Sequence, residues 1–252
     1  MAGLFRGSAQ RLLALPAEGI GEPATMKLLD LFSGAGGAAM GYYRAGFTDI
    51  VGVDIRPQKR YPFRFVQADA LEYLAEHGHE YDAIHASPPC QRYTQAQRIQ
   101  GREHPDLIAP TRDLLIRSGK PYVIENVPGA PMRVDLMLCG SMFGLRWNGL
   151  VLYRHRWFET GGGFQVSPFG PAACCHDAPA ISIFGHTVLG AVRDGRGQAY
   201  KHPNKRKHLG IEVGRKVMGI DWMTREELSE AIPPVYTEWI GRQLIETLRV
   251  TA

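Results

Sequence analysis

The chain has 252 residues, of which 44% are hydrophobic and 21% charged, ordinary proportions for a globular protein that exclude fibrous and wholly disordered classes. Its 29 basic and 25 acidic residues leave a net charge of +4, which is compatible with a nucleic-acid partner but too small to establish one. Four cysteines, no signal-peptide pattern and no long apolar run predict a reduced, cytoplasmic protein that does not engage a membrane.

From Met26 onward, short apolar strands alternate with helical patterns. Residues 1–25 are expected to form a poorly ordered extension, because glycines and a proline break their short apolar run. Strands are expected over 27–32, 50–54, 64–67, 81–86 and 122–124, and helices over 38–45, 70–76 and 107–118. This alternation predicts an α/β fold, a doubly wound and mostly parallel sheet with helices on both faces.

The last third of the chain has a different texture. After residue 159, glycines and prolines punctuate short apolar pieces, and residues 193–216 carry a local charge of +6. We therefore expect a first domain over 26–158 and a small, loop-rich basic module over 159–222. A C-terminal helix within 223–252 is expected to return to the first domain.

The first strong ligand signal is a glycine turn between a strand and a helix. Gly34-x-Gly36-x-x-Ala39 fits a nucleotide-binding fingerprint, and Asp54 follows Gly34 by 20 residues at the end of the second strand. Asp69 follows the third strand. Two acids at one sheet edge suit the hydroxyl and amino donors of an adenosine-type ligand and disfavour a pyrophosphate. The alternative is a tight turn that binds nothing.

Further reactive residue types follow later strands. Cys90 comes after two prolines at the end of the fourth strand, where a rigidly held thiol is placed like a nucleophile. Glu125 follows the fifth strand, and Arg154 and Arg156 alternate before an aromatic pair. The alternatives are a small buried cysteine, a helix-capping acid and a solvated edge strand. Each alternative is reasonable for its residue alone, but the ordered combination favours a site.

Five short motifs resemble, in chain order, those of the cytosine-5 DNA methyltransferases. They are Asp30-Leu-Phe-Ser-Gly-Ala-Gly-Gly37, Pro89-Cys90-Gln91, Glu125-Asn126-Val127, Arg154-x-Arg156 and Ile232-Pro233-Pro234. The resemblance runs from about residue 26 to 249 and is closest to the compact type often carried by phages. It implies an S-adenosylmethionine-dependent, Rossmann-like catalytic domain over 26–158, a target-recognition module over 159–222, and host cytoplasm as the location if the protein is phage-encoded.

The resemblance also implies roles for individual residues. Cys90 would attack C6 of cytosine, Glu125 would contact N3, and Arg154 and Arg156 would support the flipped base. The implied S-adenosylmethionine contacts are Phe32, Gly34, Ala35, Gly36, Gly37, Asp54, Ile55, Asp69 and Pro89. The nucleic-acid contacts expected here are Gln91, Arg92, Thr94, Lys205, Arg206 and Lys207.

Some positions depart from the family pattern and leave alternatives open. Arg92 stands where a small residue is usual. It either grips DNA when the loop closes or, with Lys59 and Arg60, pairs with a carboxylated donor that would give 5-carboxymethylcytosine. An RNA cytosine-5 methyltransferase, an inactive DNA-binding relative and a nicotinamide oxidoreductase are the other functional alternatives.

The remaining expectations concern partners and metals. Double-stranded DNA is the expected partner, and the protein is expected to be a monomer. Cys174-Cys175-His176 lacks the spacing of a zinc motif, so we expect structural thiols and no metal.

Overall fold

The structure is a computed structural model that describes residues 25–89, 106–184, 187–191 and 206–251. Its central feature is a seven-stranded sheet of order β3-β2-β1-β4-β5-β9-β6. The first five strands are parallel, and β9 lies antiparallel between β5 and β6. The strands are β1 (Lys27–Leu31), β2 (Asp49–Asp54), β3 (Arg64–Gln67), β4 (Ala83–Ala86), β5 (Tyr122–Asn126), β6 (Leu136–Leu138) and β9 (Arg156–Gly161). The predicted doubly wound, mostly parallel α/β fold is therefore confirmed.

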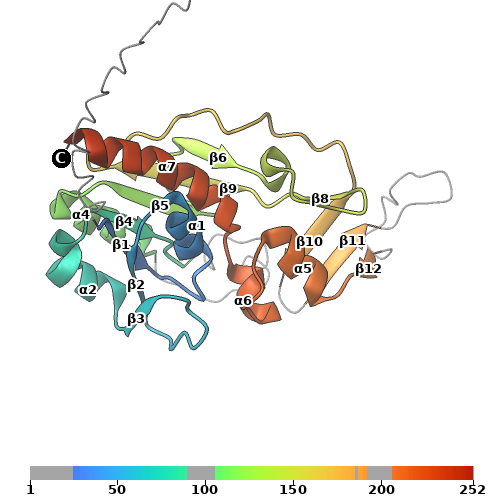
Figure 1. The fold of residues 1–252 in the computed structure, drawn as a ribbon, viewed down its shortest axis with the longest axis horizontal. Helices are drawn as coiled ribbons and strands as arrows, with labels where there is room; N and C mark the ends of the chain where they lie inside the picture. Colours follow the sequence, from blue (N-terminus) through green and yellow to red (C-terminus); the bar gives the residue numbers. More distant parts are fainter. Residues whose placement is uncertain (1–24, 90–105, 185–186, 192–205, 252) are drawn as a thin grey trace, which may run out of the picture.

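Helices cover both faces of this sheet because side chains alternate along the buried strands (Figure 1). Leu28 belongs to the core on the side of α1 (Gly37–Ala45) and α7 (Pro234–Thr251). Leu29 and Leu31 belong to the opposite core, together with residues of the helices there. Those helices are α2 (Ala70–His77), the adjoining 3-10 turn η1 (Gly78–Glu80) and α4 (Ile108–Ser118).

The C-terminal helix packs closely on the first helix of the chain. A Cβ at Gly41 would lie 2.1 Å from the carbonyl oxygen of Pro234, so only glycine permits this approach of α1 to α7. The Thr237 hydroxyl donates to the carbonyl of Ala38 at 2.8 Å. These contacts attach α7 to α1, the helix that directly follows the glycine turn. In the described part of the chain, no helix is both long and apolar enough to cross a membrane.

A second, five-stranded sheet has the order β12-β11-β10-β8-β7. Its strands are β7 (Arg146–Trp147), β8 (Leu150–Leu152), β10 (Ala180–Phe184), β11 (Thr187–Ala191) and β12 (Arg206–His208). It packs with α5 (Ile211–Met218) and α6 (Arg225–Glu230) around a small apolar core of its own.

The position predicted to divide the chain, between 158 and 159, does not separate the two sheets. Strand β9 crosses it, and β7 and β8 precede it although they belong to the second sheet. The β7–β8 hairpin turns at Asn148 and Gly149, both with positive φ, as a two-residue hairpin loop requires. The hairpin joins the second sheet because β8 pairs with β10 through Val151 and Leu152.

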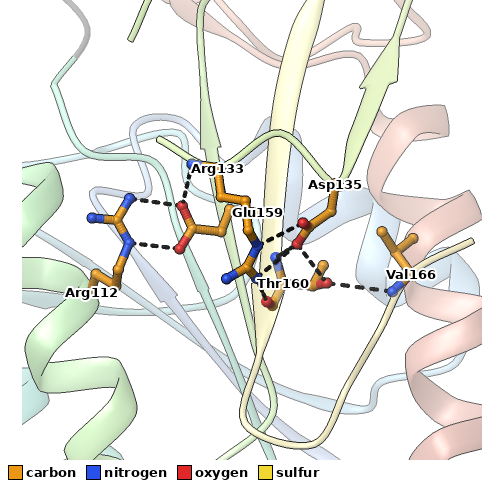
Figure 2. A network of polar contacts seen from close by, with 6 residues as sticks. All are labelled: Arg112, Arg133, Asp135, Glu159, Thr160 and Val166. Atoms are coloured by element: carbon orange, nitrogen blue, oxygen red, sulfur yellow. Dashed lines mark hydrogen bonds and ion pairs between the residues drawn. The ribbon is translucent and has the colours of Figure 1, made fainter. Parts of the chain in front are cut away.

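A network of polar contacts around the buried Glu159 and Thr160 attaches β9 to its surroundings (Figure 2). The Glu159 carboxylate accepts two hydrogen bonds from the Arg112 guanidinium of α4, at 2.6 and 2.7 Å. It also accepts the backbone N–H of Arg133. Asp135 in turn accepts from the Arg133 side chain and from Thr160. Charge pairing thus fixes the strand that lies beside Glu125.

Candidate active site

A cleft opens at the carboxyl ends of β1, β2, β4 and β5. This is where the strand order reverses, because β1 has β2 on one side and β4 on the other, and ligands of doubly wound sheets bind at such a point. The predicted residues that border the cleft are Phe32, Gly34, Ala35, Gly37, Asp54, Ile55, Asp69, Pro89, Glu125 and Arg156. The structure therefore gathers most of the predicted cofactor residues and two of the predicted catalytic ones.

The glycine turn is built around Asp54. Its carboxylate accepts the N–H of Gly34 at 3.0 Å and the N–H of Arg56 at 2.9 Å. Phe32 has a φ of 55°, a backbone conformation that is costly for a residue with a side chain and that is often found at functional sites. Gly36, with a φ of 84°, does not border the cleft but lets the turn pass Pro62, which a Cβ there would meet at 2.7 Å. Asp54 thus holds the turn and still faces the cleft.

Asp69 caps a helix and also borders the cleft. It is the N-cap residue of α2, where its side chain accepts the N–H groups of Leu71 at 2.8 Å and Glu72 at 3.1 Å. The same residue borders the cleft. Its orientation is therefore preset by the helix start, independently of any ligand.

Glu125 is a buried acid at the end of β5. The Arg156 Nε atom lies 2.8 Å from its Oε1. That oxygen has no aligned hydrogen-bond partner among the described residues. Burial raises the pKa of Glu125, and the positive charge of Arg156, the hydrogen bond from Ser87 and the charge of Arg154 lower it by less. A carboxyl group with a raised pKa beside a cleft is suited to share a proton with a ring nitrogen of a substrate.

A buried chain of polar side chains leads from α1 to Glu125. Tyr42 Oη lies 3.0 Å from His85 Nδ1, and His85 Nε2 lies 2.9 Å from Ser87 Oγ. Burial lowers the pKa of His85 to about 3, so the imidazole is neutral and has one donor and one acceptor nitrogen. Sequence reasoning missed this chain, because His85 stands in an apolar strand without any spacing signal.

Asp30 is a second buried acid on the cleft border that sequence reasoning assigned no role. Tyr61 donates to its Oδ2 at 3.0 Å, while Oδ1 has no hydrogen-bond partner within the described ranges. Burial raises the pKa of Asp30 well above its usual value. Its place in the motif around the glycine turn was the available signal.

Asn126 connects two of the predicted motifs. Its side-chain NH₂ donates to the carbonyl of Pro88 at 2.9 Å, and its side-chain oxygen accepts the N–H of Val127. This fixes the two prolines relative to Glu125. The predicted residues Cys90, Gln91, Arg92 and Thr94 follow directly and lie outside the described residues.

The two predicted arginines go to different places. Arg156 borders the cleft, whereas the Arg154 guanidinium donates to the carbonyls of Ser229, Ala231 and Ile183 at 2.6 to 3.1 Å. Alternation along a strand would place both on one face, but β9 begins only at Arg156. Arg154 therefore joins the second sheet to the segment before α7.

The other predicted cations are also accounted for. Arg60 is paired with Glu227 at 2.8 Å, and neither Lys59 nor Arg60 borders the cleft. Lys205 lies outside the described residues, and the backbones of Arg206 and Lys207 form the edge strand β12. Sequence reasoning did not predict the far wall of the cleft, which consists of Met223, Glu227, Glu230, Ala231 and Ile232.

Comparison with known proteins finds a family match over part of the chain. The model of the C-5 cytosine-specific DNA methylases matches residues 26–131. The type II methyltransferase M.FnuDI of Fusobacterium nucleatum is 34% identical over 116 residues, 41% of this chain and 33% of that protein. M.AquIA of Picosynechococcus is 31% identical over 121 residues, 41% of this chain and 49% of that protein. The matches thus span between a third and a half of these relatives.

A solved structure agrees with this fold. The S. pombe Dnmt2 methyltransferase aligns over 88% of this chain and 99% of its own, at 14% identity and a TM-score of 0.57. The family match spans β1 to β5, which carry the first three motifs and much of the cleft border, whereas Arg156 and the far wall of the cleft lie outside it. Over that segment, residues 26–131, the chain is similar to the C-5 cytosine-specific DNA methylases.

Proposed function

We propose that the protein transfers a methyl group from S-adenosylmethionine to C5 of cytosine in double-stranded DNA. The observation that carries the proposal is the position of Glu125 and Arg156 on the same cleft as the glycine turn, Asp54 and Asp69. A proton-sharing acid thus lies within one cavity with a nucleotide-type ligand site. The names of the matched relatives, type II methyltransferases, support the same chemistry.

The residues present fit the donor. Asp54 would accept hydrogen bonds from ribose hydroxyls and Asp69 from the adenine amino group, with Phe32 and the glycine turn beside them. When bound, S-adenosylmethionine supplies an electrophilic methyl group. We propose this donor and not a carboxylated analogue: neither Lys59 nor Arg60 borders the cleft and Arg60 is already paired, while Arg92, the other cation considered for a donor carboxylate, lies outside the described residues.

The chain's own residues would make the cytosine ring reactive. The Cys90 thiolate would add to C6, and Glu125 would hold a proton at N3, so that electron density reaches C5. Arg156 would keep the Glu125 carboxyl oriented. After transfer, loss of the C5 proton would restore the C5–C6 double bond and release Cys90. The base must leave the duplex for this to occur, so we include base flipping in the proposal.

The main test weighs the nucleosides of DNA incubated with the protein and S-adenosylmethionine. We expect 5-methylcytosine from the wild-type protein and none from Cys90→Ser. Cys175→Ser is the matched control and should remain active, because Cys175 lies on the surface away from the cleft. Glu125→Gln should reduce kcat about 10²- to 10⁴-fold, the usual contribution of a positioned acid.

A second test asks about covalent chemistry. DNA containing 5-fluorocytosine lacks the C5 proton whose loss releases the enzyme, so it should trap a complex through Cys90. Methylation by Cys90→Ser at the wild-type rate would refute the mechanism. A product with a carboxymethyl mass, or methylation of RNA in preference to DNA, would refute the proposed donor or substrate.

A further inference from the structure

Four side chains with metal-binding atoms meet on the side of the molecule that carries the second sheet. Cys139 precedes the 3-10 turn η3 (Gly140–Phe143), His155 precedes β9, and Cys174 and His176 lie between β9 and β10. All four ligand atoms lie within 4.8 Å of one another. None of these residues borders the described cleft, so the cluster is separate from the candidate active site.

The distances within the cluster match those around a tetrahedral ion. His176 Nε2 lies 3.7 Å from Cys139 Sγ and 3.4 Å from Cys174 Sγ, and His155 Nε2 lies 3.5 Å from Cys174 Sγ. Zinc at about 2.3 Å from sulfur and about 2.0 Å from nitrogen places neighbouring sulfur and nitrogen ligands about 3.6 Å apart. These three sulfur–nitrogen separations therefore match those that one shared Zn²⁺ would impose, and the remaining pairs lie within 4.8 Å.

Neighbouring groups orient these ligands. The Ser141 hydroxyl lies 3.3 Å from Cys139 Sγ and 3.8 Å from Cys174 Sγ, and it accepts the N–H of Cys175 at 3.2 Å. The Tyr153 ring lies 4.0 Å from the His176 ring, measured between centroids. Outer groups that fix the orientation of ligand side chains are a general feature of metal sites.

The cluster also joins segments that have little regular structure to hold them. Residues 162–179 form neither helix nor strand, and loops of that length are uncommon in compact domains without an anchor. Cys174 and His176 would anchor this loop to η3 and to the start of β9. His155 stands between Arg154 and Arg156, so the same anchor would fix the chain that carries both arginines.

We propose that Cys139, His155, Cys174 and His176 bind one structural Zn²⁺. Two thiolates and two imidazoles form a Cys₂His₂ set, and four protein ligands leave no open position for catalysis. The expectation of no metal was based on the adjacent cysteines at 174 and 175. It overlooked the site because its ligands come from three separate segments, and only the tertiary structure brings them together.

Metal content of the full-length protein tests the site. Protein purified without chelators and analysed by mass spectrometry for metals should contain about one zinc per chain. Cys174→Ser should lose it, whereas Cys175→Ser, which changes the neighbouring exposed thiol, should keep it. Equal zinc in both variants would overturn the assignment, as would a zinc-free wild-type protein that takes up none on titration.

A spectroscopic measurement on the wild-type protein avoids any dependence on how the variants fold. Cobalt(II) added to protein stripped by chelator should give the strong visible bands of a tetrahedral ion and a near-ultraviolet thiolate charge-transfer band. Zinc should displace it. A weak octahedral spectrum, or an intact mass showing a Cys139–Cys174 disulfide in freshly purified protein, would overturn the proposal. Neither measurement requires methylation, so failure of the proposed function leaves this test unaffected.

Discussion

Three buried titratable residues lie at the cleft or behind it, each with different neighbours: Glu125, Asp30 and His85. Glu125 faces Arg156, Asp30 accepts from Tyr61, and His85 lies between Tyr42 and Ser87. Burial disfavours the charged form of each, which raises the pKa of the two acids and lowers that of the histidine. Burial therefore favours the protonated form of the two acids and the neutral form of the histidine.

His85 predicts a specific dependence of stability on pH. Its pKa falls from 6.5 in the unfolded chain to about 3 in the folded protein, so the unfolded state binds the extra proton between these values. The contribution of His85 to stability is therefore fully present above pH 6.5. Below that pH, the free energy of unfolding should decrease by about 1.4 kcal/mol per pH unit.

Urea unfolding between pH 7.5 and 4.5 measures this dependence. His85→Gln keeps a polar side chain but should remove this part of the slope, so the stability difference between variant and wild type should shrink toward acid pH. His79→Gln, on the exposed turn η1, controls for the loss of a histidine. Parallel curves for wild type and His85→Gln would contradict the expected burial of a neutral imidazole.

At the scale of elements, strand β9 depends on buried charge pairing more than on its length. Glu159 is fully buried, and its carboxylate accepts hydrogen bonds from the Arg112 guanidinium of α4 and from the N–H of Arg133 (Figure 2). Such pairs are costly to break, because the remaining partner keeps its desolvation penalty. The position of β9, and with it that of Arg156, should therefore be sensitive to Arg112.

Arg112→Met tests this dependence. It leaves the Glu159 carboxylate without its main partner, so the free energy of unfolding should fall by about 3 kcal/mol or more. Arg242→Met is the matched control, since it removes an exposed arginine paired with Glu238 one turn away, and it should cost about 0–1 kcal/mol. Denaturant titration of both variants measures the two changes in the free energy of unfolding. Similar decreases would show that the buried pair contributes no more to stability than the exposed pair.

At the scale of the whole molecule, positive charge is unevenly distributed. Residues 193–216 carry more net charge than the complete chain. The end of this segment forms β12, the edge of the second sheet, and continues into α5. Within α5, Arg215 is bound to Glu212 and to the carbonyl of Met223, and Lys216 lies over the Trp147 ring. DNA contacts are therefore expected from the residues before α5.

Replacement of Lys205, Arg206 and Lys207 by alanine tests the predicted DNA contact. If each residue neutralises one phosphate, the slope of log affinity against log salt should become shallower by about 0.9 per residue, with similar weakening for all sequences. Replacement of the exposed Lys27, Arg117 and Arg249 changes net charge equally and should leave the slope nearly unchanged. Binding measured by fluorescence anisotropy over a salt series compares the two triple variants, and identical slopes would exclude a local contact.

The sequence alone determined the elements around the glycine turn and the order of the main motifs. Strands β1 to β5 and helices α1, α2 and α4 lie within a few residues of their predicted bounds. Their signals are local, because apolar alternation and a glycine turn act between residues close in the chain. The positions of Asp54, Asp69 and Glu125 followed because parallel strands end at one edge of a sheet.

Only the tertiary structure decided how distant segments meet. The β7–β8 hairpin joins the second sheet, Arg154 turns to the carbonyls before α7, and residues in and around α6 form a wall of the cleft. The meeting of Cys139, His155, Cys174 and His176 likewise joins segments that are distant in the chain. These arrangements depend on packing between residues far apart in the chain. Such contacts leave no periodic or spacing pattern in the sequence. They form because polar groups that the fold buries need hydrogen-bond partners, whichever segment supplies them.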